Sequence, residues 1–130
     1  MSSDANTQKM QMMLKALHYK VGTLDGISGK KTQDAIGAFQ DDYGLKVTEK
    51  ADQNTIDAMY AAFLDDNSDV YPDVLQLLLY YTGYYKSAID GEIGRKTEKA
   101  ISDFQGDNNL DETGEWDEDT LRKLKECLYS

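Results

Sequence analysis

Apolar side chains recur at intervals of three and four residues in six stretches of this 130-residue chain. In the first half these stretches are Met10, Met13, Leu14, Leu17; Ala35, Ile36, Phe39, Tyr43; and Ile56, Met59, Tyr60, Phe63. In the second half they are Val74, Leu75, Leu78, Leu79, Tyr81; Ala100, Ile101, Phe104; and Leu121, Leu124, Leu128. This spacing places each set on one face of a helix. The pattern therefore predicts an all-α fold with three helices in each half.

Polar residues that favour helix starts precede four of these stretches. Asn6 or Thr7 is expected to cap the first helix, and Asp52 and Asp117 are expected to cap the third and sixth, because short polar side chains accept hydrogen bonds from free backbone amides. Pro72 is the only proline, and proline is well suited to the first position of a helix. We therefore expect the fourth helix to begin there.

A motif occurs twice at an offset of 65 residues. Asp25 to Thr32 (DGISGKKT) returns as Asp90 to Thr97 (DGEIGRKT), and each copy is followed by a Phe-Gln pair, at residues 39–40 and 104–105. Residues 8–65 align with residues 73–130 without insertion or deletion, which indicates an internal repeat. The repeat predicts a flexible lead (1–7), a first domain (8–65), a linker (66–72) and a second domain (73–130). Units of this size bury limited surface alone, so we expect them to be packed together.

The position that follows the second helix also corresponds between the two copies. Gly44 lies where a helix often ends in a residue with positive φ, and Asn109 takes its place in the second copy. Asparagine is the next most common residue at such a position after glycine. Both residues are therefore expected to adopt positive φ.

The repeated residues resemble the peptidoglycan-binding-like domain, a small three-helix module. The first copy carries the pattern as Gln11, Leu14, Leu17, Tyr19, Gly22, Leu24-Asp25-Gly26, Gly29, Thr32, Ala35-Ile36, Phe39-Gln40, Gly44-Leu45 and Thr55. The second carries it as Leu75-Gln76, Leu79, Gly83-Tyr84-Tyr85, Ile89-Asp90-Gly91, Gly94, Thr97, Ala100-Ile101, Phe104-Gln105, Leu110, Thr113-Gly114 and Thr120. The copies depart from the family pattern at His18, Glu49 and Ser87, where glycine is usual.

The resemblance implies two tandem three-helix units with Gly-rich loops. It also implies a non-catalytic protein of bacterial or phage origin that binds peptidoglycan through its glycan or its stem peptides. Modules of this family usually accompany a hydrolase, and this chain contains none, so a targeting subunit of wall-hydrolysing machinery is one expectation. The alternative is an adaptor or inhibitor that keeps the fold and binds a protein partner.

The charge balance narrows the choice of partners. The chain has 24 Asp and Glu against 14 Lys and Arg, for a formal net charge of −10. Nucleic acid and anionic membranes are poor partners for such a chain because both need clustered cations. No signal peptide and no apolar stretch of about 20 residues is visible, so we expect synthesis in the cytoplasm, and a place at the wall or envelope only after release by other machinery. The expected state is a monomer.

The sequence contains none of the common catalytic or metal-binding motifs. The single cysteine, Cys127, and the single histidine, His18, lie in different copies, so a thiol nucleophile with a histidine base is not expected. Acidic residues surround Trp116, but their spacing is not that of a calcium loop. We therefore expect no enzyme activity, no cofactor and no metal.

Candidate ligand-binding residues are the tyrosines that flank the two loops and the polar residues of the repeated motif. They are Tyr19, Asp25 and Gln40 in the first copy and Tyr84, Tyr85, Asp90 and Gln105 in the second. Aromatic rings with a few fixed polar groups are typical of small binding grooves. A purely structural role is the competing interpretation for the turn residues and for the glutamines, which can bond loop backbone. Candidate residues for docking a protein are Tyr80, Tyr81 and Trp116.

Overall fold

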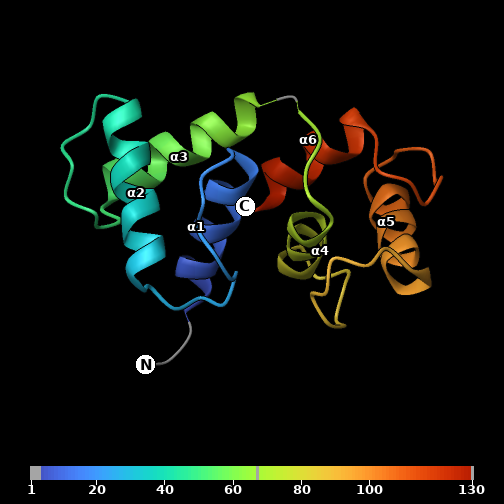
Figure 1. The fold of residues 1–130 in the computed structure, drawn as a ribbon. Coiled ribbons are helices and arrows are strands. Elements are labelled where there is room, and N and C mark those ends of the chain that lie inside the picture. Colours follow the sequence, from blue (N-terminus) through green and yellow to red (C-terminus); the bar gives the residue numbers. More distant parts are fainter. Residues whose placement is uncertain (1–3, 67, 130) are drawn as a thin grey trace. The chain divides into compact units, whose positions relative to one another are not determined.

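The computed structural model describes residues 4–66 and 68–129, and these contain six helices and no strand. The chain divides into two compact units, Met1–Asp66 (unit 1) and Asn67–Ser130 (unit 2). Unit 1 contains α1 (Ala5–Ala16), α2 (Lys30–Asp42) and α3 (Gln53–Asp65), and unit 2 contains α4 (Pro72–Tyr81), α5 (Arg95–Asp107) and α6 (Glu118–Cys127), as Figure 1 shows. The predicted all-α architecture of two three-helix units is confirmed. Packing of the units against each other stays a prediction.

The first helix of unit 1 begins earlier than predicted. Asp4 is its N-cap, and the Oδ1 atom of Asp4 accepts a hydrogen bond from the backbone N–H of Asn6 at 3.0 Å. The backbone N–H of Asp4 also donates to the carbonyl of Gly26 at 2.9 Å, which fixes the entry to the helix. The predicted cap at Asn6 or Thr7 is therefore wrong, and residues 5–7 belong to α1 rather than to a flexible lead. Residues 1–3 of that lead lie outside the described residues.

The other predicted helix starts are confirmed. The carboxylate of Asp52 accepts a hydrogen bond from the N–H of Thr55, and Asp117 does the same for Thr120, each at 2.8 Å. These bonds satisfy backbone donors that a helix start leaves free. Pro72 is the first residue of α4.

Each unit forms its core around its first helix. In unit 1, α1 contacts both α2 and α3, and in unit 2, α4 contacts both α5 and α6. The large side chains with less than 2% exposure include Leu14, Ile36, Phe39, Met59 and Phe63 in unit 1 and Leu75, Leu78, Leu79 and Phe104 in unit 2. Burial of one such side chain stabilises a fold by about 2 kcal/mol. The predicted helical faces therefore supply most of both cores, but Tyr43 of the second face is 48% exposed, and Met12 and Leu77, which the spacing did not select, are completely buried.

Three aligned backbone positions adopt positive φ in both units, with glycine in one unit and another residue in its counterpart. The pairs are His18 (φ 74°) and Gly83 (93°), Gly44 (70°) and Asn109 (59°), and Glu49 (60°) and Gly114 (74°). The prediction for Gly44 and Asn109 is confirmed. Side chains with a Cβ are strained in this region, so the shared backbone path is imposed by tertiary structure rather than by local preference.

Candidate functional site

The Asp-Gly loop of unit 1 is held by one buried glutamine. Gln11 is on α1 and is completely buried. Its Oε1 atom accepts from the N–H of Gly26 at 2.8 Å, and its Nε2 atom lies 3.0 Å from both the carbonyl of Ile27 and the hydroxyl of Thr32. One side chain therefore joins the first helix to the turn and to the first turn of α2. A buried polar group in such a network costs free energy if any partner is removed.

Gln76 performs the same role in unit 2. It is also completely buried, accepts from the N–H of Gly91 at 2.9 Å, and donates toward the carbonyl of Glu92 at 3.0 Å and the hydroxyl of Thr97 at 3.3 Å. Tyr85 adds a contact that unit 1 lacks, because its hydroxyl lies 3.4 Å from the Gln76 amide nitrogen and Lys20 occupies the aligned position of unit 1. The loop of unit 2 is therefore anchored by an aromatic side chain as well as by the amide.

A second pair of glutamines anchors the turn before the third helix of each unit. Gln40 accepts from the N–H groups of Thr48 and Glu49 and donates to the carbonyl of Lys50. Gln105 makes the equivalent bonds in unit 2, to residues 113, 114 and 115. Both side chains have 0% exposure. The interpretation in which they bond loop backbone is confirmed, and a ligand-binding role for them stays a prediction.

Asp25 and Asp90 form the corners of the two loops. The Oδ1 atom of Asp25 accepts from the N–H of Ile27, and that of Asp90 accepts from the N–H of Glu92, each at 2.9 Å. These backbone hydrogen bonds, together with the amide of Gln11 or Gln76, lower the pKa of both carboxyl groups. Both residues are exposed, but one oxygen of each already belongs to the turn.

Tyr19 and Tyr84 occupy equivalent places beside the phenylalanine of each core. The Tyr19 ring meets Phe39 edge to face at 5.9 Å between centroids, and the Tyr84 ring meets Phe104 at 5.3 Å. The hydroxyl of Tyr19 donates to Asp42 at 2.6 Å. Burial is the main cause that raises the pKa of Tyr19, and the Asp42 hydrogen bond adds to it.

In unit 2 the order of these causes is reversed. The hydroxyl of Tyr84 donates to Asp107 at 2.7 Å, and this bond is the main cause that raises the pKa of Tyr84 to about 12, with burial second. Both phenols stay neutral at physiological pH. Their hydroxyl groups are already bound within the protein, so the rings serve mainly as supports of the loops.

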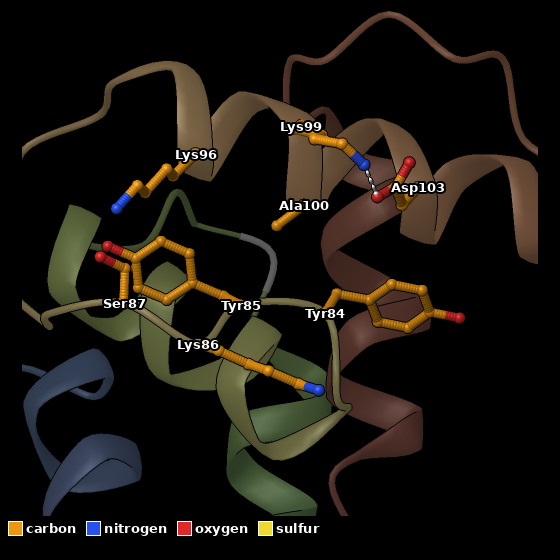
Figure 2. Close-up of a pocket in the computed structure, with 8 residues that line it drawn as sticks. All are labelled: Tyr84, Tyr85, Lys86, Ser87, Lys96, Lys99, Ala100 and Asp103. Atoms are coloured by element: carbon orange, nitrogen blue, oxygen red, sulfur yellow. Dashed lines mark hydrogen bonds and ion pairs between the residues drawn. The ribbon is translucent and has the colours of Figure 1, made fainter.

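A cleft of about 350 Å³ lies in unit 2 between α5 and the loop that follows α4 (Figure 2). We call it the lysine cleft because three of its lining side chains are lysines. It is lined by Tyr84, Tyr85, Lys86, Ser87, Lys96, Lys99, Ala100 and Asp103. In Figure 2, Tyr85 and Tyr84 point to opposite sides, and Lys96, Ser87 and the Tyr85 hydroxyl lie at the same end of the cleft.

Tyr85 forms a fixed wall of the lysine cleft. It is only 5% exposed, and its hydroxyl donates to the carbonyl of Ala88 at 2.6 Å. The structure therefore brings two of the predicted ligand residues, Tyr84 and Tyr85, to one cleft. The predicted residues Asp90 and Gln105 of the same unit do not line it.

Unit 1 has a cleft of about 400 Å³ in a different place. It lies among α1, α2 and the loop before α3, and it is lined by Thr7, Met10, Ser28, Gln33, Ile36, Thr48, Glu49, Lys50 and Ala51. None of the predicted residues Tyr19, Asp25 and Gln40 lines it. The residue of unit 2 that aligns with Ala51 is Trp116, so unit 2 carries the largest side chain where unit 1 leaves space.

The three candidate docking residues differ in exposure. Tyr80 is 47% exposed and meets Tyr81, which is half-buried, edge to face at 5.0 Å. Trp116 is half-buried, and its indole N–H donates to Asp69 at 2.7 Å, which ties the segment before α4 to the loop before α6. Trp116 therefore has a structural role, and docking through these residues stays a prediction.

The described residues contain no cluster of three or more His, Cys, Asp or Glu side chains that could hold a metal ion. None of the helices in residues 4–66 and 68–129 has the length and apolar character that crossing a membrane requires. Cys127 is half-buried near the end of α6.

Sequence reasoning missed the four residues that give the lysine cleft its chemistry: Lys86, Ser87, Lys96 and Lys99. A signal was present in the alignment of the two copies, because Lys86 aligns with Val21, Ser87 with Gly22 and Lys99 with Asp34. These replacements put basic and polar groups into the copy that is otherwise more acidic. That these residues line one cleft could not be predicted from the sequence, because it depends on the backbone path of the loop.

Comparison with known proteins identifies a family for both halves of the chain. The model of a family described as "Putative peptidoglycan binding domain" matches residues 3–59 and, separately, residues 73–124. The second segment contains every residue of the lysine cleft. Searches of curated proteins and of solved structures found no match.

Proposed function

The chain belongs to the putative peptidoglycan-binding domain family, and we propose that it is a non-catalytic bacterial or phage protein that binds the cell wall through the lysine cleft of unit 2. The observation that carries this proposal is the cleft itself. It is open, it is built from the loop and helix that the family motif defines, and it combines a fixed aromatic wall with polar groups at its rim. Small binding sites commonly have this composition.

Acid–base properties support a binding role rather than hydrolysis. Asp25, Asp52, Asp90 and Asp117 have shifted pKa values, and each is shifted downward by backbone hydrogen bonds. A glycosidase needs one carboxylic acid whose pKa is raised, so that it can donate a proton near neutral pH. The proposal therefore assigns the protein to targeting, as a monomeric subunit that holds wall-hydrolysing machinery at its substrate after other machinery has released it to the envelope.

The experiment is co-sedimentation of the full chain with purified, insoluble peptidoglycan sacculi. We expect the wild-type protein to sediment with sacculi. Asp103 and Ala38 occupy aligned, exposed positions on α5 and α2, but only Asp103 lines the lysine cleft. Asp103→Trp should block the cleft and leave the protein in the supernatant, and Ala38→Trp should sediment like the wild type. Wild-type protein that stays in the supernatant at low salt would overturn the proposal.

A protein partner is the second candidate function, and the exposure of Tyr80 favours it. Tyrosines that present a ring and a hydroxyl to solvent are frequent at protein interfaces. If an adaptor or inhibitor role is correct, affinity capture should return one stoichiometric partner, and Tyr80→Ser should abolish capture without changing sedimentation with sacculi. Capture that is indifferent to Tyr80→Ser would count against this function.

A further inference from the structure

The lysine cleft concentrates positive charge in the more acidic half of the protein. Residues 73–130 carry 7 basic and 13 acidic side chains, a net charge of −6. Three of those seven basic residues, Lys86, Lys96 and Lys99, line this single cleft, together with only one acidic residue, Asp103. Lysines therefore outnumber acidic residues around the cleft, so an anion meets a more favourable local potential there than over the acidic remainder of unit 2.

Two of the three lysines are available to a ligand. Lys99 forms an ion pair with Asp103 at 2.7 Å, one turn further along α5. Lys86 and Lys96 are exposed, and neither has an ion-pair partner among the described residues. The hydroxyl of Ser87 likewise has no hydrogen-bond partner within the described part of the chain. In Figure 2 the ammonium group of Lys96 lies near Ser87 at one end of the cleft, and the ammonium group of Lys86 points away from them. The cleft therefore offers an ammonium group with a hydroxyl donor at one end and a second, separate ammonium group to ligands with acceptor oxygens.

Unit 1 does not reproduce this arrangement. At the aligned positions it has Val21 for Lys86 and Asp34 for Lys99, and it has Gly22 for Ser87. A Cβ atom built at Gly22 would lie 3.0 Å from Cδ of Lys31, so the Lys31 side chain runs closely over this glycine. Gly22 has a φ of 79°, whereas Ser87 is not among the residues with positive φ, so the backbone takes a different path at this position of unit 2.

We infer that the lysine cleft binds carboxylates of the peptidoglycan stem peptide, one through a charge-assisted hydrogen bond from Lys96 with a hydrogen bond from Ser87, and another through Lys86. This inference rests on the proposed function and names the group that is recognised. Stem peptides carry free carboxylates, whereas the N-acetylated sugars of the glycan are neutral. Two unpaired ammonium groups match carboxylates, and they would have no partner in a neutral glycan. The glycan therefore makes secondary contacts at most.

Because the lysines are exposed, the contribution of each one is modest and sensitive to salt. The Debye length is about 8 Å at physiological ionic strength, so added salt weakens contacts of this kind. An exposed ion pair changes an equilibrium by up to about fivefold. Removal of both lysines should therefore lower affinity by up to about 25-fold and should flatten the dependence of binding on salt.

The test uses the full chain with two probes, purified sacculi and a soluble disaccharide–peptide fragment whose carboxylates are either free or converted to carboxamides. Wild-type protein should bind the free fragment at least about tenfold more tightly than the amidated one. Lys86→Gln combined with Lys96→Gln should lose that preference. Lys20→Gln combined with Lys31→Gln is the matched control in unit 1, with the same change of charge, and should behave as the wild type.

Three outcomes separate the possible failures. Wild-type protein that binds sacculi but does not distinguish the free from the amidated fragment would overturn the carboxylate assignment and leave the proposed function standing. Binding lost from sacculi whose phosphate polymers have been stripped, with their peptides intact, would also overturn it, because the anion recognised would then be a phosphate. Wild-type protein that binds neither probe would overturn the proposed function together with the inference.

Discussion

Units 1 and 2 share their internal hydrogen-bond network but differ at the surface. Gln11 and Gln76 hold the Asp-Gly turns through the same backbone atoms, with distances that differ by 0.1 Å at the glycine N–H. In contrast, Val21 in the loop before the turn and Asp34 on α2 are replaced by Lys86 and Lys99 in unit 2. The repeated motif is therefore architecture, and the specificity that we propose rests on positions that the repeat does not keep.

The largest expected effect tests the shared network. Gln11→Leu and Gln76→Leu each remove the hydrogen-bond partner of a glycine N–H, buried at Gly26 and half-buried at Gly91, and of a buried threonine hydroxyl. We expect each change to destabilise its own unit by about 3 kcal/mol, because an unsatisfied buried group costs about 1–3 kcal/mol. Trp116 is the only tryptophan, so urea unfolding followed by its fluorescence reports on unit 2, and circular dichroism reports on both units. A cost below about 1 kcal/mol in either unit would show that the network is not the common anchor.

The next effect concerns the exchange of glycine with other residues at positive φ. Gly44→Ala should cost about 1 kcal/mol, because alanine is disfavoured in the left-handed region. Gly44→Asn copies Asn109 of unit 2, and it should cost less than half as much because asparagine tolerates that region. Thermal unfolding of the two variants measures the difference. Equal losses would show that the backbone path at this position differs between the units.

Acidity should affect both units in the same way. Backbone hydrogen bonds lower the folded-state pKa of Asp25 and Asp90 below the ordinary value of 3.8. A lowered pKa contributes stability that is present above the unfolded-state value and is lost as pH falls through the folded-state value. The melting temperature should therefore be flat near neutral pH and fall below about pH 4.

Asparagine variants isolate this pH dependence. Asp25→Asn and Asp90→Asn keep an acceptor oxygen for the turn and remove the titrating group. Each should therefore reduce the fall of the melting temperature at acid pH. A fall that is unchanged in both variants would assign the acid sensitivity to other carboxyl groups. The caps Asp52 and Asp117, whose pKa values are also lowered, are the first alternatives.

The smallest expected effect distinguishes the two supporting tyrosines. Because the hydrogen bond to Asp107 is the main cause of the raised pKa of Tyr84, Asp107→Asn should bring that pKa down from about 12 toward 10. Burial dominates at Tyr19, so Asp42→Asn should leave more of the upward shift in place. An NMR titration of labelled tyrosine at alkaline pH measures both. Complete return of the Tyr19 pKa to 10 would contradict the assigned order of causes.

The fold was accessible from sequence because helical spacing and turn chemistry agree along the chain. The faces of Leu14, Phe39 and Phe63 are the buried faces, and Asp52, Pro72 and Asp117 mark helix starts as predicted. The prediction of the first N-cap was wrong because the backbone N–H of Asp4 is held by a hydrogen bond to the carbonyl of Gly26. No local pattern reports a contact across more than twenty residues.

The candidate site could be predicted only in part from the sequence. Tyr84 and Tyr85 were found because aromatic residues beside a loop are a general signal, and they do line the lysine cleft. The backbone bonds of Gln40 and Gln105 could not be distinguished from a ligand-binding role, because a repeated spacing does not reveal whether an amide points to solvent or to backbone. Lys86, Lys96 and Lys99 were missed because isolated lysines are ordinary on a surface, and only the fold brings them around one cleft.

The central claim is that the two units share a framework while unit 2 binds the wall, and one co-sedimentation measurement with sacculi tests it directly. Lys86→Val with Lys99→Asp gives unit 2 the residues of unit 1. Lys20→Val with Lys30→Asp makes the same change of charge in unit 1, where Lys30 and Asp34 form the matching ion pair at 3.4 Å. We predict that the unit 2 variant loses binding by about tenfold or more while the unit 1 variant binds like the wild type. Equal binding by both variants, or a loss confined to the unit 1 variant, would contradict the account.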